Sequence, residues 1–226
     1  QIGVAILHPI RWRERFQKSH AGRPVGRSTA PSHDGSIRYE VLDVRSAEQI
    51  TRLIASLSRL DVLVNNAGIS NFTKIALTSP DEWQADVQSN LNGAYNCIHA
   101  VLPGMIEQGG GAIVNLGSTA GIVGDYQLAV YSAMKGAVHA FTQVLAKEVG
   151  QHGIRVNCVC PGVIETPMTA PLTANPEMKK ILDGMTPMGR MGKAEEIASA
   201  VMWLCSDQAS FVTGHPLVVD GGATAD

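Results

Sequence analysis

The sequence predicts an α/β domain in which a parallel sheet lies between two layers of helices. The chain has 226 residues, 45% of them hydrophobic, and from Ile37 onward short strand-like segments alternate with helix-like segments. This length is enough for one domain with a sizeable core. Strands that alternate with helices form βαβ units, whose strands run parallel. We therefore expect one domain over residues 1–226, with a doubly wound, three-layer α/β/α arrangement.

The first predicted elements follow from apolar alternation and a helix start signal. Residues 37–42 alternate apolar and polar side chains, which predicts a strand. Ser46 has Gln49 three residues later, a spacing typical of a capping box, and this predicts a helix over about 46–60. The apolar residues 62–64 then predict a short buried strand.

A long helix is predicted over residues 81–107. The segment Ser79-Pro80-Asp81-Glu82 combines a cap residue, a proline at the first helical position and a glutamate at the third. Pro103 predicts a bend in this helix. Three consecutive glycines, 109–111, end it.

The second half of the chain continues the same alternation. Strands are predicted over residues 112–116, 154–160 and 217–219, and helices over residues 131–149 and 193–205. The polar, Pro-rich and Met-rich stretch 166–190 interrupts the pattern. Ligands of parallel α/β sheets bind outside the carboxyl ends of the strands. Four distinctive clusters fall at such ends: Asp43, Asn65 to Gly68, Ser118, and Pro161 to Thr166.

Tyr131 and Lys135 share one face of a predicted helix because they are four residues apart. A free tyrosine has a pKa of about 10, and a neighbouring ammonium lowers that pKa. Tyr131 is therefore a candidate proton donor or acceptor for a carbonyl or an alcohol. On spacing alone, an ordinary Tyr/Lys pair on a solvated helix remains an alternative.

Ser118 and Asn90 are two further candidates. Ser118 follows a predicted strand, where its hydroxyl could bind a substrate oxygen, or could only satisfy the local backbone. Asn90 lies inside the long predicted helix, although asparagine is unfavourable there. It has either a tertiary role or simple exposure to solvent.

Together, these segments resemble the short-chain dehydrogenase/reductase family over about four fifths of the chain. The resemblance rests on the order of the motifs and on the 13-residue interval between Ser118 and Tyr131. The matching segments are Asp43-Val44, Asn65-Asn66-Ala67-Gly68, Asn90-Leu91-Asn92-Gly93, Asn115-Leu116-Gly117-Ser118, Tyr131-Ser132-Ala133-Met134-Lys135, Arg155 to Gly162, Thr166-Pro167-Met168, Phe211-Val212-Thr213-Gly214 and Val219-Asp220-Gly221-Gly222.

The resemblance implies a Rossmann-type fold and reversible hydride transfer between NAD(P)(H) and a secondary alcohol or ketone. It implies a catalytic tetrad. Tyr131 would be the general acid/base, Lys135 would lower its pKa and bind the nicotinamide ribose, Ser118 would orient the substrate oxygen, and Asn90 would hold a relay water. The cofactor-binding residues implied are Gly3, Asp43, Val44, Asn66, Ala67, Gly68, Tyr131, Lys135, Pro161, Gly162, Ile164 and Thr166. NAD is favoured over NADP.

The same resemblance implies a substrate lid over residues 166–190. It also implies a homo-oligomer, a dimer or tetramer, formed through the two long helices 81–107 and 131–149. Four methionines in the lid favour an apolar substrate. We expect a cytoplasmic location, a small alcohol or ketone as substrate, and neither nucleic-acid nor membrane partners.

The N-terminal segment 1–36 departs from the family. The family has a glycine-rich turn that lays pyrophosphate on a helix N-terminus, and here Gln1 to Ile6 resembles only the last glycine, Gly3, and the start of that helix. We expect the N-terminal strand to be absent or irregular. One hypothesis is a truncated start with a shifted reading frame through roughly residues 7–36, which the source DNA would test.

Charge leaves two further alternatives open. Residues 1–40 hold seven Lys and Arg against three Asp and Glu, whereas the whole chain has a net charge of −2. This basic segment could be an arm that binds nucleic acid. Loss of the phosphate turn could instead leave a cofactor-impaired, non-catalytic homologue, a scaffold or an inactive truncated product. The four cysteines and scattered histidines have no ligand-like spacing, and no metal site is expected.

Overall fold

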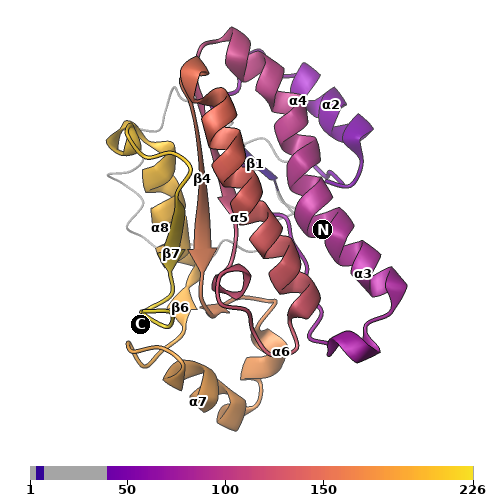
Figure 1. Ribbon diagram of the computed structural model, residues 1–226, viewed down its shortest axis with the longest axis vertical. Helices are drawn as coiled ribbons and strands as arrows, with labels where there is room; N and C mark the ends of the chain where they lie inside the picture. The colour runs from indigo at the N-terminus through magenta and orange to yellow at the C-terminus, as the bar shows by residue number, and fades with distance from the viewer. Residues whose placement is uncertain (1–3, 8–39, 226) are drawn as a thin grey trace.

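The computed structural model describes residues 4–7 and 40–225. Its strands are β1 (Val4–Leu7), β2 (Val62–Asn65), β3 (Gly111–Leu116), β4 (Ile154–Pro161), β5 (Ile164–Glu165), β6 (Gly192–Lys193) and β7 (Pro216–Val219). Its main helices are α2 (Ala47–Ala55), α3 (Pro80–Asp86), α4 (Gly93–Glu107), α5 (Ala129–Val149), α6 (Ala170–Thr173), α7 (Pro176–Gly184) and α8 (Ala194–Cys205). Figure 1 shows α5 lying across the sheet.

The main sheet has the order β1-β2-β3-β4-β7. The pairs β2–β3, β3–β4 and β4–β7 are parallel, as the alternation of strands and helices predicts. Asn65 lies beside Asn115, and Pro161 lies beside Val219, so the carboxyl ends of these strands meet at one edge. The loops that follow them are therefore neighbours in space.

β1 departs from this arrangement because it pairs antiparallel with β2. Val4 lies beside Asn65 and Leu7 lies beside Val62. The chain therefore leaves β1 at the edge opposite to the carboxyl ends of the parallel strands. The expectation of an irregular N-terminal strand is met, but the expectation that the segment ending at Ile6 begins a helix is wrong, since Val4–Leu7 is a strand. Gly3 lies outside the described residues.

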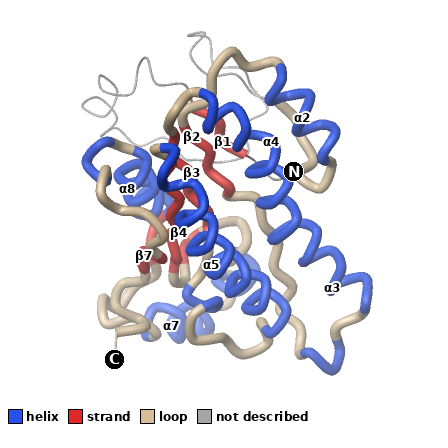
Figure 2. Tube along the Cα trace, turned by 45° about the horizontal axis from the view of Figure 1, so that its top comes forward, coloured by secondary structure: helices blue, strands red, loops and turns tan. Residues whose placement is uncertain are grey.

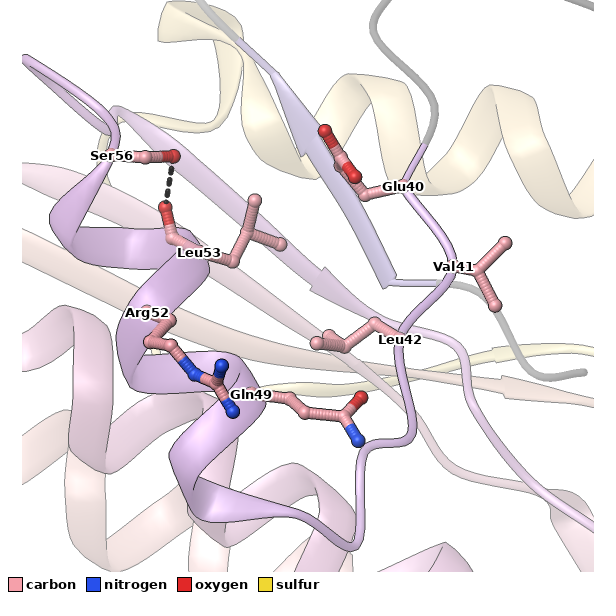
Figure 3. Close-up of a pocket in the computed structure, with 7 residues that line it drawn as sticks. All are labelled: Glu40, Val41, Leu42, Gln49, Arg52, Leu53 and Ser56. Atoms are coloured by element: carbon pink, nitrogen blue, oxygen red, sulfur yellow. Dashed lines mark hydrogen bonds between the residues drawn. The ribbon is translucent and has the colours of Figure 1, made fainter.

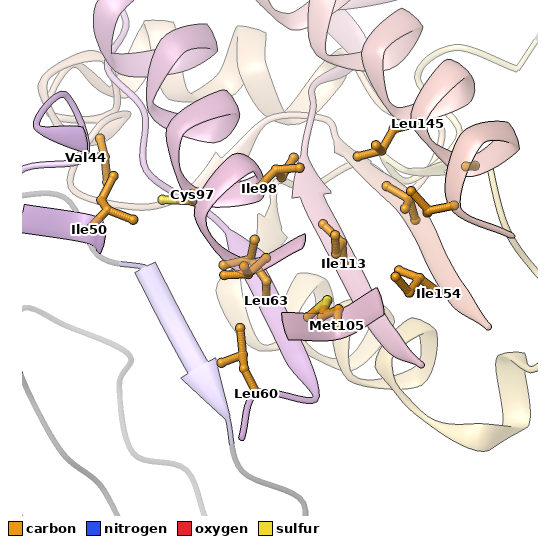
Figure 4. Packing of buried hydrophobic residues seen from close by; sticks show 14 residues of the cluster. Val44, Ile50, Leu60, Leu63, Cys97, Ile98, Met105, Ile113, Leu145 and Ile154 are labelled. Atoms are coloured by element: carbon orange, nitrogen blue, oxygen red, sulfur yellow. The ribbon is translucent and has the colours of Figure 1, made fainter. Parts of the chain in front are cut away.

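Helices cover both faces of the sheet, and each face has its own core (Figures 1 and 2). On one face, α2, α4 and α5 bury a large apolar cluster. Figure 4 labels ten of its residues: Val44, Ile50, Leu60, Leu63, Cys97, Ile98, Met105, Ile113, Leu145 and Ile154. On the other face, α8 packs on a second cluster that includes Val64, Val114 and Val159. Because adjacent strand residues such as Leu63 and Val64 point to opposite faces, each strand serves both cores.

α2 begins where the sequence predicts but ends earlier. The Ser46 hydroxyl accepts from the backbone N–H of Gln49, as a cap should. The Gln49 side chain does not return to Ser46 but accepts from the backbone N–H of Asp43, which fixes the preceding turn. The helix ends at Ala55. Residues 40–42 form no strand, so this part of the predicted strand over 37–42 is wrong, and residues 37–39 lie outside the described residues.

The predicted long helix is present, but its interruption lies elsewhere than at Pro103. α3 begins with the predicted capping box of Ser79 and Glu82. Between α3 and α4 the helix widens into a π-helical segment, Val87–Asn92, while Pro103 lies within α4. π-helical turns occur frequently at functional sites, and this one contains Asn90.

The predicted lid, residues 166–190, contains the two helices α6 and α7. Its base is closed by a two-stranded parallel ribbon of β5 and β6, in which Ile164 lies beside Gly192. In Figure 1 this region lies at the bottom, below the carboxyl ends of β4 and β7. Within the part of the chain that the structure describes, no helix is long and apolar enough to cross a membrane.

Candidate active site

The four predicted catalytic residues come from three segments that meet at the carboxyl edge of the sheet. Ser118 follows β3 and caps the short 3₁₀ helix Thr119–Gly121 through its hydroxyl, which accepts from the backbone N–H of Ala120. Tyr131 and Lys135 lie in the first turns of α5. Asn90 lies in the π-helical segment.

A buried polar chain fixes α5 against the sheet. The Asn65 side-chain amide donates to Asn115 at 2.9 Å, and Asn115 in turn donates to the Thr142 hydroxyl at 2.9 Å. Thr142 then donates to the carbonyl of Val138, one turn earlier in α5. Buried polar groups need such partners. This chain sets how α5, and with it Tyr131, lies over β2 and β3.

Lys135 is buried at the centre of the site. Only 5% of its surface is exposed, and its Nζ donates to the carbonyl of Leu116 at 2.6 Å. Burial lowers the pKa of Lys135 to about 8, against the smaller raising effects of Cys158 and Cys160. The ammonium lies 5.5 Å from the centre of the Tyr131 ring. At neutral pH, Lys135 thus remains mostly protonated while its proton is held less firmly than in water.

Tyr131 is held protonated at neutral pH. Burial raises its pKa, the negative charge of Asp86 raises it further, and the hydrogen bond with the Ser118 side chain opposes both. The prediction that Lys135 lowers the pKa of Tyr131 below its ordinary value is wrong here, because the burial of the phenol outweighs the hydrogen bond with Ser118, and the charge of Asp86 acts in the same direction as burial. The phenol is consequently a proton donor within reach of Ser118.

Asn90 is buried, and its side chain bonds to two separate segments of the chain. Only 2% of its surface is exposed. Its amide donates to the Asp86 carboxylate and to the Ile69 carbonyl, and its Oδ1 accepts from the backbone N–H of Ile69 at 3.2 Å. The alternative of an exposed helix asparagine is therefore excluded. The amide fixes the loop after β2 against the π-helical segment.

Asp86 belongs to the site, although the sequence analysis did not single it out. It is almost fully buried and its carboxylate also accepts from the Asn71 side chain at 3.1 Å. Burial raises the pKa of Asp86, while the hydrogen bonds from Asn71 and Asn90 lower it. Its position one helical turn before Asn90 was the available signal, since residues four apart share a helix face.

Gly68 leaves room next to the catalytic residues. A Cβ at this position would lie 2.7 Å from the Asn90 Oδ1 and 3.6 Å from the Lys135 Nζ. Its neighbour Ala67 packs on the larger core, whereas Asn66 is exposed. The loop after β2 thus places the backbone of Gly68, which has no side chain, beside Lys135. The exposed side-chain amide of Asn66 lies further away.

The predicted adenine-side pair, Asp43 and Val44, lies further along the same edge. The Asp43 carboxylate binds the guanidinium of Arg45 through two nitrogens, and this hydrogen-bonded pair holds the pKa of Asp43 at about 2. The Val44 side chain is buried in the larger core, and its carbonyl accepts from Asn96. Only the Asp43 side chain of this pair is exposed.

The predicted nicotinamide-side residues form the floor of the lid. The Pro161 carbonyl accepts from the Thr119 hydroxyl, and the Gly162 N–H donates to the Val219 carbonyl. The Thr169 hydroxyl donates to the Ile164 carbonyl, and it accepts a hydrogen bond from the backbone N–H of Thr166 at 3.0 Å. These contacts join β3, β4, β7 and the start of the lid into one surface.

Two pockets lie near these residues. One, of about 350 Å³, lies at the base of the lid and is lined in part by Ile164, Met188 and Val218. The other, of about 490 Å³, lies between residues 40–42 and helix α2 (Figure 3). Neither lining contains any of the predicted catalytic residues, so we assign neither pocket a catalytic role.

One cluster contradicts an expectation from the sequence. His139, Cys158 and Cys160, which the spacing analysis treated as unrelated, lie together beneath the catalytic residues. The histidine is 19 residues from the nearer cysteine, and it comes from α5 whereas the cysteines come from β4. Only packing brings them together, so no local spacing rule could find them.

Comparisons with known proteins agree with this geometry. The sequence family described as enoyl-(acyl carrier protein) reductase matches residues 19–224. A 3-oxoacyl-(acyl-carrier-protein) reductase of Chlamydia muridarum is 37% identical over 206 residues, which cover 89% of this chain and 82% of that protein. A cyclopentanol dehydrogenase of Comamonas is 41% identical over 196 residues, covering 85% and 78% respectively.

Solved structures give the same result. A gluconate 5-dehydrogenase from Burkholderia cenocepacia, in complex with NADP and tartrate, superposes with a TM-score of 0.79 at 34% identity, covering 82% of this chain and 74% of that one. ElxO with NADP bound superposes with a TM-score of 0.76 at 31% identity, covering 82% and 77%.

Fold and site together define a Rossmann-type, NAD(P)-dependent oxidoreductase that acts on CH–OH groups. The chain belongs to the short-chain dehydrogenase/reductase family, as its motifs indicate.

Proposed function

We propose that this protein interconverts a ketone and a secondary alcohol, with Tyr131 as the proton donor and acceptor. The observation that carries the proposal is the placement of the Tyr131 hydroxyl, hydrogen-bonded to Ser118, beside the buried ammonium of Lys135. NAD(P)H supplies the hydride when bound. A protonated phenol next to a second donor suits protonation of the oxygen of a carbonyl that is being reduced.

Each side chain has a distinct task in this proposal. Ser118 orients the substrate oxygen, and Tyr131 gives it a proton. Lys135 offers an ammonium whose pKa of about 8 lies close to working pH, so it can pass a proton toward Tyr131. Asn90 holds the loop after β2 in place and offers a polar route from Lys135 toward solvent.

The residues present fit the nicotinamide half of the nucleotide. Because Gly68 has no side chain, it leaves a space directly beside the Lys135 ammonium that a Cβ would fill. A ribose hydroxyl is a suitable acceptor for that ammonium. Gly68, Lys135 and the lid floor from Pro161 to Thr166 are the residues that would hold this half of the cofactor, and Asp43 would border the adenine.

For the choice of nucleotide, we favour NADP(H) over the NAD favoured by the sequence analysis. Two similar structures are described with NADP bound. The acidic residue that selects NAD in this type of fold was not identified in the sequence, and the N-terminal segment where it would lie is outside the described residues.

An apolar ketone is the substrate class that the lid supports best. Met168, Met185 and Met188 are exposed side chains of the lid. Methionine adapts to differently shaped apolar groups. The substrates in the names of two relatives, a 3-oxoacyl chain and cyclopentanol, each contain an apolar hydrocarbon part, whereas the gluconate in the name of one similar structure is polar.

The test is a titration of the purified protein with NADPH and NADH separately, followed by nucleotide fluorescence. A panel of acetoacetyl-CoA, cyclopentanone and a sugar ketone is then tested with the preferred nucleotide. We expect saturable binding of NADPH and turnover of an apolar ketone. A folded sample that binds nucleotide but reduces none of these ketones would contradict the substrate class.

A second candidate is a cofactor-impaired homologue, and the antiparallel β1 is the observation that favours it. In a parallel first strand, the chain would exit at the carboxyl edge, where a helix N-terminus can bind pyrophosphate. Here Leu7 lies beside Val62, at the opposite edge. Absence of binding of both nucleotides by a folded sample would support this candidate over the enzyme.

Assembly and location complete the proposal. α4 and α5 carry exposed apolar side chains, among them Tyr95, Ile106 and Val144, which supports a homo-oligomer through these helices. Light scattering coupled to size-exclusion chromatography would give the number of copies. We also propose a cytoplasmic location, which fractionation of the source cells would test.

A further inference from the structure

Two thiols and an imidazole lie together directly beneath the catalytic residues. Cys158 and Cys160 are two apart on β4, so both point to the same face of the strand. His139 lies on α5, one turn after Lys135. The Cys160 Sγ lies 3.2 Å from the His139 Nε2 and 3.8 Å from the Cys158 Sγ, and all three atoms lie within 4.8 Å of one another.

These separations match those of a metal site. Zinc lies about 2.3 Å from sulfur and about 2.0 Å from nitrogen, which places the ligand atoms of a tetrahedral ion about 3.5–3.8 Å apart. The distances from Cys160, 3.2 Å to His139 and 3.8 Å to Cys158, differ from these values by a few tenths of an ångström, whereas the His139–Cys158 pair, within 4.8 Å, has to move closer by up to about 1 Å. Two thiolates and an imidazole form a donor set for a borderline or soft ion.

The surroundings favour such an ion. Cys158 and Cys160 are both 0% exposed, and His139 is also largely shielded from solvent. The Cys160 thiol donates to the Cys158 sulfur, and the Cys158 thiol donates to the carbonyl of Val159. An ion that binds both sulfurs displaces both thiol protons.

The cluster also contacts the catalytic residues. The Cys160 thiol lies close to the backbone N–H of Ser118, and both cysteines lie close enough to Lys135 for its ammonium to interact with them electrostatically. Gly117, the residue before Ser118, leaves the room for this contact: a Cβ there would collide with His139 and lie 2.6 Å from the Cys158 Sγ. A change at the cluster therefore reaches Ser118 and Lys135 directly.

We propose that His139, Cys158 and Cys160 form a binding site for Zn²⁺ or a related d¹⁰ ion, and that its occupation inhibits the enzyme. On binding, Zn²⁺ forms bonds to the two sulfurs and the imidazole nitrogen, and the two thiol protons leave to solvent. The cluster lies against Gly117, the residue before Ser118, so the side-chain movements that binding requires are passed to Ser118. The inhibitory half rests on the proposed function, but metal binding does not.

Cobalt binding tests the site without any substrate or nucleotide. The reduced protein is titrated with Co²⁺, which reports thiolate ligands through a near-ultraviolet charge-transfer band and tetrahedral geometry through its visible bands. We expect one equivalent of Co²⁺ to develop both, and one equivalent of Zn²⁺ to abolish them. Cys160→Ala and His139→Ala should lose the bands, whereas the matched control Cys205→Ala, on α8, should keep them.

Several results would overturn the site. One is a folded wild-type protein, checked by circular dichroism, that gives no cobalt bands. Another is a band that survives in Cys158→Ala/Cys160→Ala. Loss of two thiols on mild oxidation with diamide, in a protein that binds no Co²⁺, would identify a redox-active thiol pair in place of a metal site.

Inhibition is measured separately, once a substrate has been found. Saturating Zn²⁺ should lower kcat of the wild type by about 5- to 150-fold, the range of ordinary coupling between sites, and a chelator should restore it. Cys160→Ala should be insensitive. Intact cobalt bands with unchanged kcat would overturn the coupling to catalysis while leaving the metal site in place.

Discussion

Two regions of the main sheet differ in how well they suit the proposed catalysis: the region of β3, β4 and α5, and the region of β1. At β3, β4 and α5, buried polar groups hold one another: Lys135 bonds to Leu116, and Asn90 bonds to Asp86 and to the loop after β2. At β1, the strand runs antiparallel and its end lies at the wrong edge for a phosphate-binding turn. The chain thus has a fully packed catalytic edge next to an atypical nucleotide edge.

This difference indicates that different segments of the chain build the two halves of the site. The catalytic edge depends on contacts among β2, β3, β4, the π-helical segment and α5, all within residues 62–161. The nucleotide edge is formed by β1 and by the segment from Asp43 to Arg45. β1 reaches the catalytic edge through its pairing with β2, and we expect variants in each region to separate chemistry from nucleotide binding.

The largest effect is expected from Tyr131→Phe. Removing the phenol hydroxyl removes the proton donor, so kcat should fall by about 10²- to 10⁴-fold. Nucleotide affinity, measured by NADPH fluorescence, should stay close to that of the wild type. An equal loss of nucleotide affinity would show that the two edges are not separable.

Lys135→Met should have the next largest effect, and stability adds a second readout. We expect kcat to fall by about 10²-fold. Because the pKa of Lys135 is about 8 in the folded protein and 10.5 ordinarily, the unfolded chain binds more protons between these values. The free energy of unfolding of the wild type should therefore rise between pH 8 and 10.5, by on the order of 3 kcal/mol.

The variant should lack this rise, since methionine does not titrate. Urea unfolding of both proteins at pH 7.5, 8.5 and 9.5 measures it. These conditions stay below the ordinary pKa of tyrosine, about 10, so Tyr131 does not contribute. Parallel pH dependence in the two proteins would contradict a lowered pKa for Lys135.

Gly68→Ala should have an intermediate effect at the boundary between the two edges. The new Cβ would lie 2.7 Å from the Asn90 Oδ1, which has to move. We expect a loss of about 1–3 kcal/mol in the free energy of unfolding and a weaker affinity for nucleotide. Gly104→Ala in α4 is the matched control, because a Cβ there meets nothing within 4 Å. The control should be slightly stabilised, by about 0.5–1 kcal/mol.

The smallest effect is expected from Arg45→Ala, at the nucleotide edge. The Arg45 and Asp43 side chains are 56% and 40% exposed, and exposed ion pairs contribute little to stability. The midpoint of thermal unfolding should not change measurably, while the pKa of Asp43, now about 2, should rise toward its ordinary value. Carboxyl NMR measures that pKa. A large drop in nucleotide affinity would show that Arg45 itself binds the cofactor.

Much of the fold was predictable because its signals are local. The cap residues Ser46 and Ser79 and the apolar strand 62–64 each act within one turn or one strand, and the structure places helices and a strand there. The strand over 37–42 was wrong in its described part, since alternation alone does not ensure that a neighbouring strand is present to pair with it. The π-helical widening around Asn90 has no simple sequence signal.

For the site, the sequence by itself predicted which side chains would carry the proposed chemistry. Tyr131 and Lys135 meet because one helical turn separates them, and Ser118 lies at a strand end because the apolar run before it stops there. Spacing along one element fixes such relations whatever surrounds it.

Only the tertiary structure decided how these groups behave. Burial by neighbouring elements raises the pKa of Tyr131 and lowers that of Lys135, and for the tyrosine this is opposite to what its spacing from Lys135 suggested. Packing of α5 on β4 brings His139 to Cys158 and Cys160, and pairing with β2 sets the direction of β1. Each of these depends on contacts between segments far apart in the chain, and no local pattern records them.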